Sequence, residues 1–194
     1  MAENLSDQDN NARFIEYPYD LHKTWWNDMQ HRKMRALCAR IHAGEKVLDV
    51  GCNSGYVQEF VPTTCEVHGV DLSPALVEIA KTRYASAQVA GADVLPFPDK
   101  SFDVVILAGV IEYVFDPNQV MNELARVARR MILIEANHPL GVWGTHRIPS
   151  HEYMVRSYTE ETCQELLETV GKVTWREIIE GHGQKQHMCF EITL

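Results

Sequence analysis

The sequence predicts a doubly wound α/β fold, with a mostly parallel seven-stranded sheet, helices on both faces and a C-terminal antiparallel hairpin. Short apolar runs alternate with segments of helical periodicity, which is typical of parallel strands joined by crossover helices. The first run stops abruptly at a loop flanked by glycines, and the last two runs are separated by a short glycine-rich turn. The 194 residues, 45% hydrophobic and 23% charged, suit one well-buried domain.

Seven apolar runs bounded by turn residues are expected to form the strands. They cover residues 46–50, 66–71, 88–92, 102–108, 131–136, 173–179 and 187–194. The last two runs should pair as a hairpin through the turn Gly181-His182-Gly183.

Helices are expected where apolar residues recur every three or four positions. They cover about residues 23–41, 56–60, 74–80, 118–130 and 159–171. Ser73 provides an N-cap with Pro74 at the first helical position, and Thr159 caps the last helix, for which Gly171 is the expected stop.

Composition argues against several classes of protein. No apolar run approaches the roughly 18 to 20 residues that span a bilayer, and the N-terminus lacks the layout of a signal peptide, so a cytoplasmic protein without membrane contact is expected. Five scattered cysteines without a CxxC spacing favour reduced thiols over disulfides or a zinc site. A net charge of −9 without a run of lysine and arginine argues against a nucleic-acid partner.

The ends of the first two strands carry the candidate ligand site, because open α/β sheets bind ligands at the carboxyl ends of their strands. Asp49 precedes the loop 51–55, whose glycines allow backbone to approach a ligand closely, although such a loop alone also suits a plain tight turn. Asp71 lies 22 residues further on (71 minus 49), at the end of the next strand, where a carboxylate can accept hydrogen bonds from both hydroxyls of a ribose. The loop and the acid together predict an adenosine-containing ligand.

Three ordered segments make this prediction more specific. They read Val-Leu-Asp-Val-Gly-Cys-Asn-Ser-Gly at 47–55, Gly-Val-Asp-Leu-Ser-Pro at 69–74, and Ala-Asp-Val-Leu-Pro-Phe-Pro-Asp-Lys-Ser-Phe-Asp-Val-Val at 92–105. They resemble the successive motifs of class I S-adenosylmethionine-dependent methyltransferases, which have a Rossmann-like fold, and the resemblance covers about residues 44–140. Asn53 stands where the family usually has glycine, and the loop lacks the GxGxxG pattern of a nicotinamide-binding site.

The resemblance implies S-adenosylmethionine as cofactor and S-adenosylhomocysteine as product. The first loop would line the methionine part, Asp71 would hold the ribose, and Leu72 would pack on the adenine ring, which Asp93 and the backbone of Val94 would also meet. The implied cofactor-binding residues are Asp49, Gly51, Cys52, Asn53, Gly55, Asp71, Leu72, Ala92, Asp93, Val94, Ala108 and Gly109.

The methyl acceptor should lie beside the ends of the fourth and fifth strands. Tyr113 is either an acceptor contact or a packing aromatic, and His138 is either a general base or a hydrogen-bonded structural histidine. A base is needed only if the acceptor must lose a proton, because methyl transfer is a direct displacement. The candidate acceptor-binding residues are Trp26, Tyr113, His138, Trp143, His146, His151 and Tyr153. The histidine spacings match no ligand pattern, so no metal is expected.

The predicted organisation is one methyltransferase domain at residues 13–194 after a disordered tail at 1–12. It comprises an N-terminal helical cap over about 17–42, a cofactor-binding core over about 44–140 and an acceptor-side lid over about 138–158.

The predicted function is transfer of a methyl group from S-adenosylmethionine to an oxygen, nitrogen or carbon atom of a small molecule. Two alternatives stay open at this point. One is an RNA or protein acceptor, and the other is a non-catalytic, cofactor-binding subunit that activates a partner. The residue pattern leaves the identity of the acceptor and the oligomeric state open, because these depend on loops.

Overall fold

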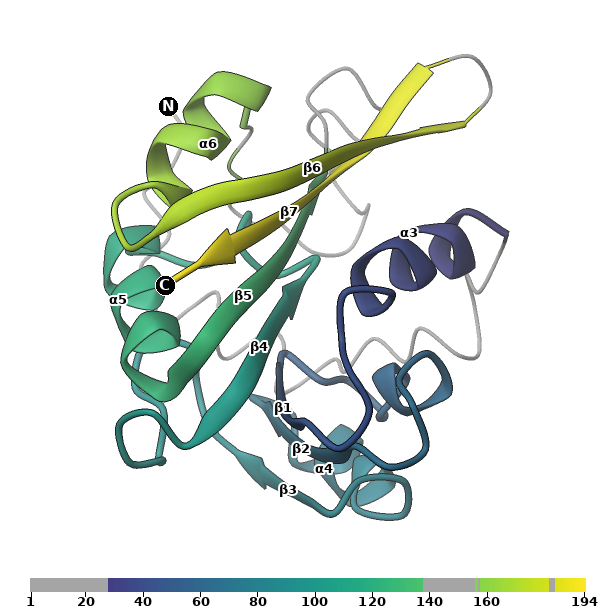
Figure 1. Ribbon diagram of the computed structural model, residues 1–194. Helices are drawn as coiled ribbons and strands as arrows, with labels where there is room; N and C mark the ends of the chain where they lie inside the picture. The colour runs from purple at the N-terminus through teal and green to yellow at the C-terminus, as the bar shows by residue number, and fades with distance from the viewer. Residues whose placement is uncertain (1–27, 138–155, 157, 182–183) are drawn as a thin grey trace, which may run out of the picture.

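The computed structural model describes residues 28–137, 156, 158–181 and 184–194. A seven-stranded sheet crosses the molecule in the order β3-β2-β1-β4-β5-β7-β6 (Figure 1). The strands are β1 (Lys46–Val50), β2 (Glu66–Asp71), β3 (Ser86–Val89), β4 (Phe102–Ala108), β5 (Ala128–Asn137), β6 (Lys172–Gly181) and β7 (Gln184–Thr193).

The sheet is parallel from β3 to β5 and antiparallel beyond. β1 pairs in parallel with both β2 and β4, so the chain order reverses at β1. β7 runs antiparallel to both β5 and β6, which confirms the predicted hairpin and the predicted fold class. The carboxyl ends of β1 and β4 therefore meet at the reversal, where open α/β sheets bind their ligands.

Helices cover both faces of the sheet (Figure 1). The short 3-10 helix η1 (Val57–Glu59) shares one face with α3 (Asp28–Cys38) and α4 (Pro74–Ala80), and the other face carries α5 (Pro117–Val127) and α6 (Glu160–Leu167). Side chains of β5 alternate between the two apolar layers: Ile132 and Ile134 face α5 and α6, while Met131 and Leu133 face α3. The central strands are thus buried on both sides, as the near-continuous apolar runs indicated.

The prediction of a third strand at 88–92 is wrong in its bounds. β3 begins at Ser86 and ends at Val89, because these residues pair with His68 to Asp71 in parallel register. Ala90 still donates its N–H to the Asp71 carbonyl at 3.1 Å, but the chain then leaves the sheet. Pairing with β2, rather than the local apolar pattern, decides where the strand lies.

The helices also end differently from the prediction. The helix expected over 118–130 ends at Val127, because Ala128 has extended backbone (φ −82°, ψ 139°) and pairs with Phe102 as the first residue of β5. The helix expected over 56–60 is a single 3-10 turn. The last helix has the predicted N-cap, since the Thr159 side chain accepts from the Thr162 N–H, but it ends at Leu167.

Gly171 has a different role from the expected helix stop. It precedes β6, and a Cβ at this position would lie 2.6 Å from the carbonyl oxygen of Thr193. Glycine is required here because the backbone of β7 approaches closely, not because a helix ends.

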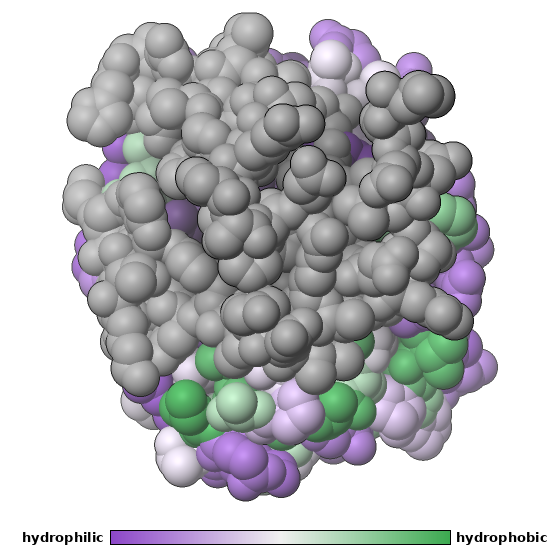
Figure 2. Space-filling view, turned by 180° about the vertical axis from the view of Figure 1, so that it is seen from behind, coloured by the Kyte–Doolittle hydropathy of each residue, from purple (hydrophilic) through white to green (hydrophobic). Residues whose placement is uncertain are grey.

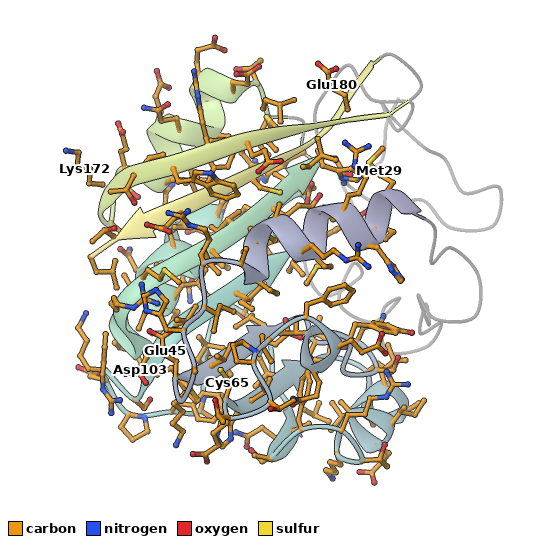
Figure 3. All side chains as sticks on the ribbon, turned by 45° about the vertical axis from the view of Figure 1, so that its right-hand side comes forward. Met29, Glu45, Cys65, Asp103, Lys172 and Glu180 are labelled. Carbon is orange, nitrogen blue, oxygen red and sulfur yellow. The ribbon has the colours of Figure 1, made fainter. Side chains whose placement is uncertain are left out.

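Ion pairs close the amino-terminal edge of the sheet, where Glu45 and Asp103 lie (Figure 3). Arg130 Nη2 is 2.6 Å from Glu45 Oε1, and Arg129 Nη1 is 3.1 Å from Asp103 Oδ1. The Lys46 backbone N–H also donates to Asp103 at 2.9 Å. Structural contacts therefore occupy this edge, and the opposite edge carries the predicted site.

The five cysteines are all buried and form no disulfide, in agreement with the predicted reduced thiols. They lie in the described part of the chain, at Cys38, Cys52, Cys65, Cys163 and Cys189. Burial raises the pKa of the Cys163 thiol to about 12, so this group is inert at neutral pH. None of the described helices is long and apolar enough to cross a membrane.

Candidate cofactor and acceptor site

The loop after β1 is built from left-handed backbone. Gly51 (φ 75°), Asn53 (φ 50°) and Gly55 (φ 88°) all have positive φ. The N–H groups of Gly51 and Cys52 both donate to the Val70 carbonyl, at 2.8 and 2.9 Å, which ties the loop to β2. A Cβ at Gly51 would overlap the side chain of Val110, so glycine also permits close contact with the segment after β4. Asn53 replaces the usual glycine at little cost, because asparagine tolerates this conformation.

Asp71 joins the loop to the end of β2. Its Oδ2 accepts the Asn53 N–H at 2.8 Å, and its Oδ1 accepts the Ser73 N–H at 2.9 Å. Burial raises the pKa of this carboxyl, and the backbone N–H groups of Ser73 and Asn53 oppose the rise. Each carboxylate oxygen keeps a further lone pair, which fits the hydroxyls of a ribose. Sequence reasoning found this residue but missed its second role in holding the loop.

Asp49 is a buried acid below the same loop. Tyr84 donates its hydroxyl hydrogen to Asp49 Oδ2 at 2.7 Å and accepts the Val57 N–H at 3.1 Å. Burial raises the Asp49 pKa to about 7, the Tyr84 hydrogen bond opposes the rise, and the charge of Asp71 adds to it. A cationic group placed nearby would favour the ionised form of Asp49. The site therefore suits a ligand with positive charge, such as the amino group and sulfonium of S-adenosylmethionine.

Tyr84 was missed by the sequence analysis. It follows α4 and carries no motif, and only the fold brings it to Asp49, 35 residues away in the chain.

The predicted adenine contacts gather after β3. A Cβ at Gly91 would overlap the Asp93 carboxylate and lie 3.7 Å from Leu72 Cδ2, so glycine here leaves room for both side chains. The Asp93 carbonyl accepts from Gln119 Nε2 at 3.0 Å, which fixes the segment against α5. Val94 is 66% exposed, which suits a residue that offers its backbone to a ligand.

The segment after β4 lies next to the loop after β1. Gly109 has positive φ (66°), and its N–H donates to the Glu135 carbonyl at 3.1 Å. Tyr113 is half-buried in the turn that follows, and its N–H donates to the Val110 carbonyl at 2.9 Å. The structure thus brings Gly109 and Tyr113 to the carboxyl edge where they were expected.

Two buried glutamates flank this segment and were not predicted as site residues. Glu112 accepts the N–H of Asn137, and Glu135 lies within β5. Burial, reinforced by the charge of Glu135, raises the Glu112 pKa to about 7. Burial alone would also raise the Glu135 pKa, but Lys33 and His187 outweigh it and lower the value to about 2. The only sequence signal for either was position: Glu112 follows β4, and Glu135 is the one acid in an apolar run.

Most of the candidate acceptor residues lie outside the described residues. They are Trp26, His138, Trp143, His146, His151 and Tyr153. Most of the proposed lid over 138–158 and the tail over 1–12 lie there as well.

The fold and the site together define a Rossmann-like domain for an adenosine-containing cofactor. Residues 48–131 match the family model of the methyltransferase domain. This part of the chain is a class I S-adenosylmethionine-dependent methyltransferase domain, and its cofactor is S-adenosylmethionine.

Similar proteins include small-molecule methyltransferases. Demethylmenaquinone methyltransferase of Tropheryma whipplei is 35% identical over 116 residues, which are 54% of this chain and 48% of the relative. A probable S-adenosylmethionine-dependent methyltransferase of Mycolicibacterium smegmatis is 31% identical over 134 residues, which are 66% of this chain and 52% of the relative. The chain thus spans about half the length of the curated relatives it matches.

Solved structures confirm the fold over nearly the whole chain. Magnesium protoporphyrin IX methyltransferase from Synechocystis, solved with bound S-adenosylmethionine, has a TM-score of 0.74 at 14% identity and covers 100% of this chain and 99% of its own. A possible histamine N-methyltransferase from Thermotoga maritima has a TM-score of 0.73 at 17% identity, covering 95% and 99%.

Proposed function

We propose that the protein transfers a methyl group from S-adenosylmethionine to an oxygen, nitrogen or carbon atom of a small molecule and releases S-adenosylhomocysteine. The observation that carries the proposal is the double attachment of Asp71, which holds the loop after β1 through Asn53 and keeps acceptor capacity for a ribose. A loop fixed in this way is preorganised for the cofactor.

The chain's own residues would bind and orient the reactants. Asp49 would face the positively charged methionine end, Asp71 the ribose, and Leu72 with Asp93 the adenine. S-adenosylmethionine supplies an electrophilic methyl group, and the protein mainly aligns the acceptor with it. Tyr113 and His138 are proposed to contact the acceptor.

Charge and surface composition support a small acceptor. The net charge of −9 would repel a polyanion such as RNA. On the side turned away in Figure 1, the described surface mixes hydrophilic and hydrophobic residues (Figure 2). The names of the relatives from Tropheryma whipplei and Geobacter sulfurreducens refer to menaquinone or ubiquinone, which are small molecules. These observations favour a metabolite over a macromolecule.

Calorimetric titration with S-adenosylmethionine and S-adenosylhomocysteine tests the cofactor site. Purified protein, stripped of carried-over cofactor, should bind both, and Asp71→Asn should raise the Kd at least about tenfold because a hydrogen-bond acceptor is lost. Asp103→Asn, at the amino-terminal edge of the sheet, is the matched control and should bind normally. Unchanged affinity in a folded Asp71→Asn protein would contradict the proposed site.

An acceptor screen then separates the proposal from its alternatives. Transfer of a labelled methyl group to small hydroxyl, amine or quinol compounds supports the proposal. Labelling of RNA or protein instead would favour a macromolecular acceptor, and tight cofactor binding with activity only beside a second protein would favour the partner-subunit alternative.

A further inference from the structure

A buried network of three charged or titratable side chains lies at the carboxyl edge of the sheet. Lys33 Nζ on α3 donates to Glu135 Oε2 at 3.0 Å, and His187 Nδ1 on β7 lies 2.6 Å from Glu135 Oε1. The Glu135 side chain is 0% exposed and that of His187 is 5% exposed. Figure 3 shows how α3, which begins near Met29, approaches the end of the hairpin that carries Glu180, where Arg32 donates to the Glu180 carbonyl at 3.0 Å.

The network determines which nitrogen of His187 is basic. Burial would raise the pKa of Glu135, but the charge of Lys33 and the charge and hydrogen bond of His187 lower it, so Glu135 is a carboxylate at neutral pH. A carboxylate only accepts hydrogen bonds, so Nδ1 of His187 must carry the hydrogen. In the neutral ring, Nε2 then has the free lone pair. No hydrogen bond to Nε2 occurs among the residues that the structure describes.

This histidine lies beside the segment that lines the cofactor site. His187 pairs with Asn137, the last residue of β5, and Glu135 accepts the Gly109 N–H through its carbonyl. A Cβ on Gly109 would lie 3.6 Å from Glu135 Oε2. The Glu135–His187 pair therefore lies beside the end of β4. It belongs to the half of the sheet that contains β5 and β7, not to the half that contains β2 and β3.

A second polar side chain, Glu112, is tied to the same end of β5 through Asn137. Glu112 is 1% exposed and accepts the Asn137 N–H through Oε1, but its Oε2 is buried without a hydrogen bond among the described residues. Buried polar atoms are normally satisfied, so this unpaired carboxyl oxygen indicates that a further polar hydrogen is received near Asn137, the residue that pairs with His187 in the sheet.

We propose that His187 is the general base of the methyl transfer and that Glu135 is its positioning residue, for an acceptor whose hydroxyl or N–H must lose a proton. This inference rests on the proposed function. A lone pair of the acceptor oxygen or nitrogen forms a bond to the methyl carbon, while the carbon–sulfur bond breaks and its electron pair stays on sulfur, giving S-adenosylhomocysteine. The acceptor proton passes to Nε2, and the imidazolium formed is stabilised by Glu135. Water then removes the proton.

Lys33 sets the charge of the pair. Its ammonium group lies 3.0 Å from Glu135 Oε2 and compensates the buried carboxylate. The carboxylate that holds Nδ1 of His187 therefore stays ionised, and it stabilises the positive charge that proton transfer to the ring creates.

Histidine nitrogen NMR tests the proposal without knowledge of the acceptor. S-adenosylmethionine carries a positive charge on sulfur that S-adenosylhomocysteine lacks, and a base for the transferred methyl group must lie close to that sulfur. The nitrogen chemical shift of His187 Nε2 should therefore differ between the two saturated complexes, because the positive charge of a sulfonium within roughly 8 Å polarises the ring.

The control and the assignment use the same spectra. His187→Asn identifies the resonance, because asparagine retains an N–H donor near the position of Nδ1 and should keep the bond to Glu135. The nitrogen shifts of His42, exposed at the amino-terminal edge, should be the same in both complexes. Equal His187 Nε2 shifts in two saturated complexes, or a ring with hydrogen on Nε2 only, would overturn the base role while leaving the cofactor site intact. Failure of calorimetry to detect binding would overturn the proposed function and this inference with it.

Discussion

Replacing Asp49 by asparagine should remove part of the pH dependence of folding. The Asp49 pKa is about 7 in the folded protein, because the group is buried, against 3.8 for the free carboxyl. Between these values the folded protein retains a proton that the unfolded chain has lost, so the free energy of unfolding falls as pH rises, by about 1.4 kcal/mol per pH unit. From pH 5 to pH 7 this contribution falls by about 2 kcal/mol, because the slope halves as the pH reaches the folded pKa, and it levels off above about pH 8.

Urea unfolding of the cofactor-free protein at several pH values measures this effect. The difference in unfolding free energy between wild type and Asp49→Asn should decrease by about 2 kcal/mol from pH 5 to pH 7. Glu112 has a similarly raised pKa of about 7, so the variant should retain a slope of the same sign. Asp103→Asn is the control, because hydrogen bonds led by the Lys46 N–H lower the Asp103 pKa and it titrates below this window. Parallel pH profiles for wild type and Asp49→Asn would refute the reasoning.

Three further predictions concern the loop and the buried network. Gly51→Ala should destabilise the protein by about 2 to 4 kcal/mol, because its φ is 75° and the new Cβ meets Val110; adding Val110→Ala should restore part of the loss of Tm. Lys33→Met should lower the free energy of unfolding in urea at pH 7 by about 3 to 5 kcal/mol, since it leaves Glu135 buried without the Lys33 cation. A decrease below about 1 kcal/mol would mean that the pair is not buried in solution. Once an ionisable acceptor is found, His187→Asn should lower kcat by about 10² to 10⁴ at neutral pH with little change in Tm or cofactor Kd, and undiminished turnover would exclude it as the base.

The sequence predicts where the proposed cofactor residues lie in the fold, because these residues belong to local patterns at strand ends. Asp49, Gly51 and Asp71 lie at the ends of short apolar runs, and parallel pairing brings such ends together whatever the details of the helices. The bounds of β3 and α5 were less predictable, since Ser86 and Ala128 join the sheet through pairing with distant residues rather than through their own propensity.

The polar interior was not predictable in the same way. Tyr84 reaches Asp49 only through the fold, and His187 carries no motif within a strand of mixed composition. In the sequence Glu135 is one acid in an apolar run. Its ion pair with Lys33, 102 residues earlier, exists only in the folded protein. Contacts of this kind are set by which strands become neighbours, and a single sequence contains no local signal for them.

The residues of the Lys33–Glu135–His187 network and the proposed cofactor residues come from different parts of the chain. The proposed cofactor contacts come from one continuous stretch, β1 to the end of β4. The network instead needs one residue from near each end of the described chain. A chain cut before β7 would keep every predicted cofactor ligand and lose the proposed base. Variation near the termini can therefore change acceptor chemistry while the cofactor half stays as it is, which gives this architecture a simple route to new substrates.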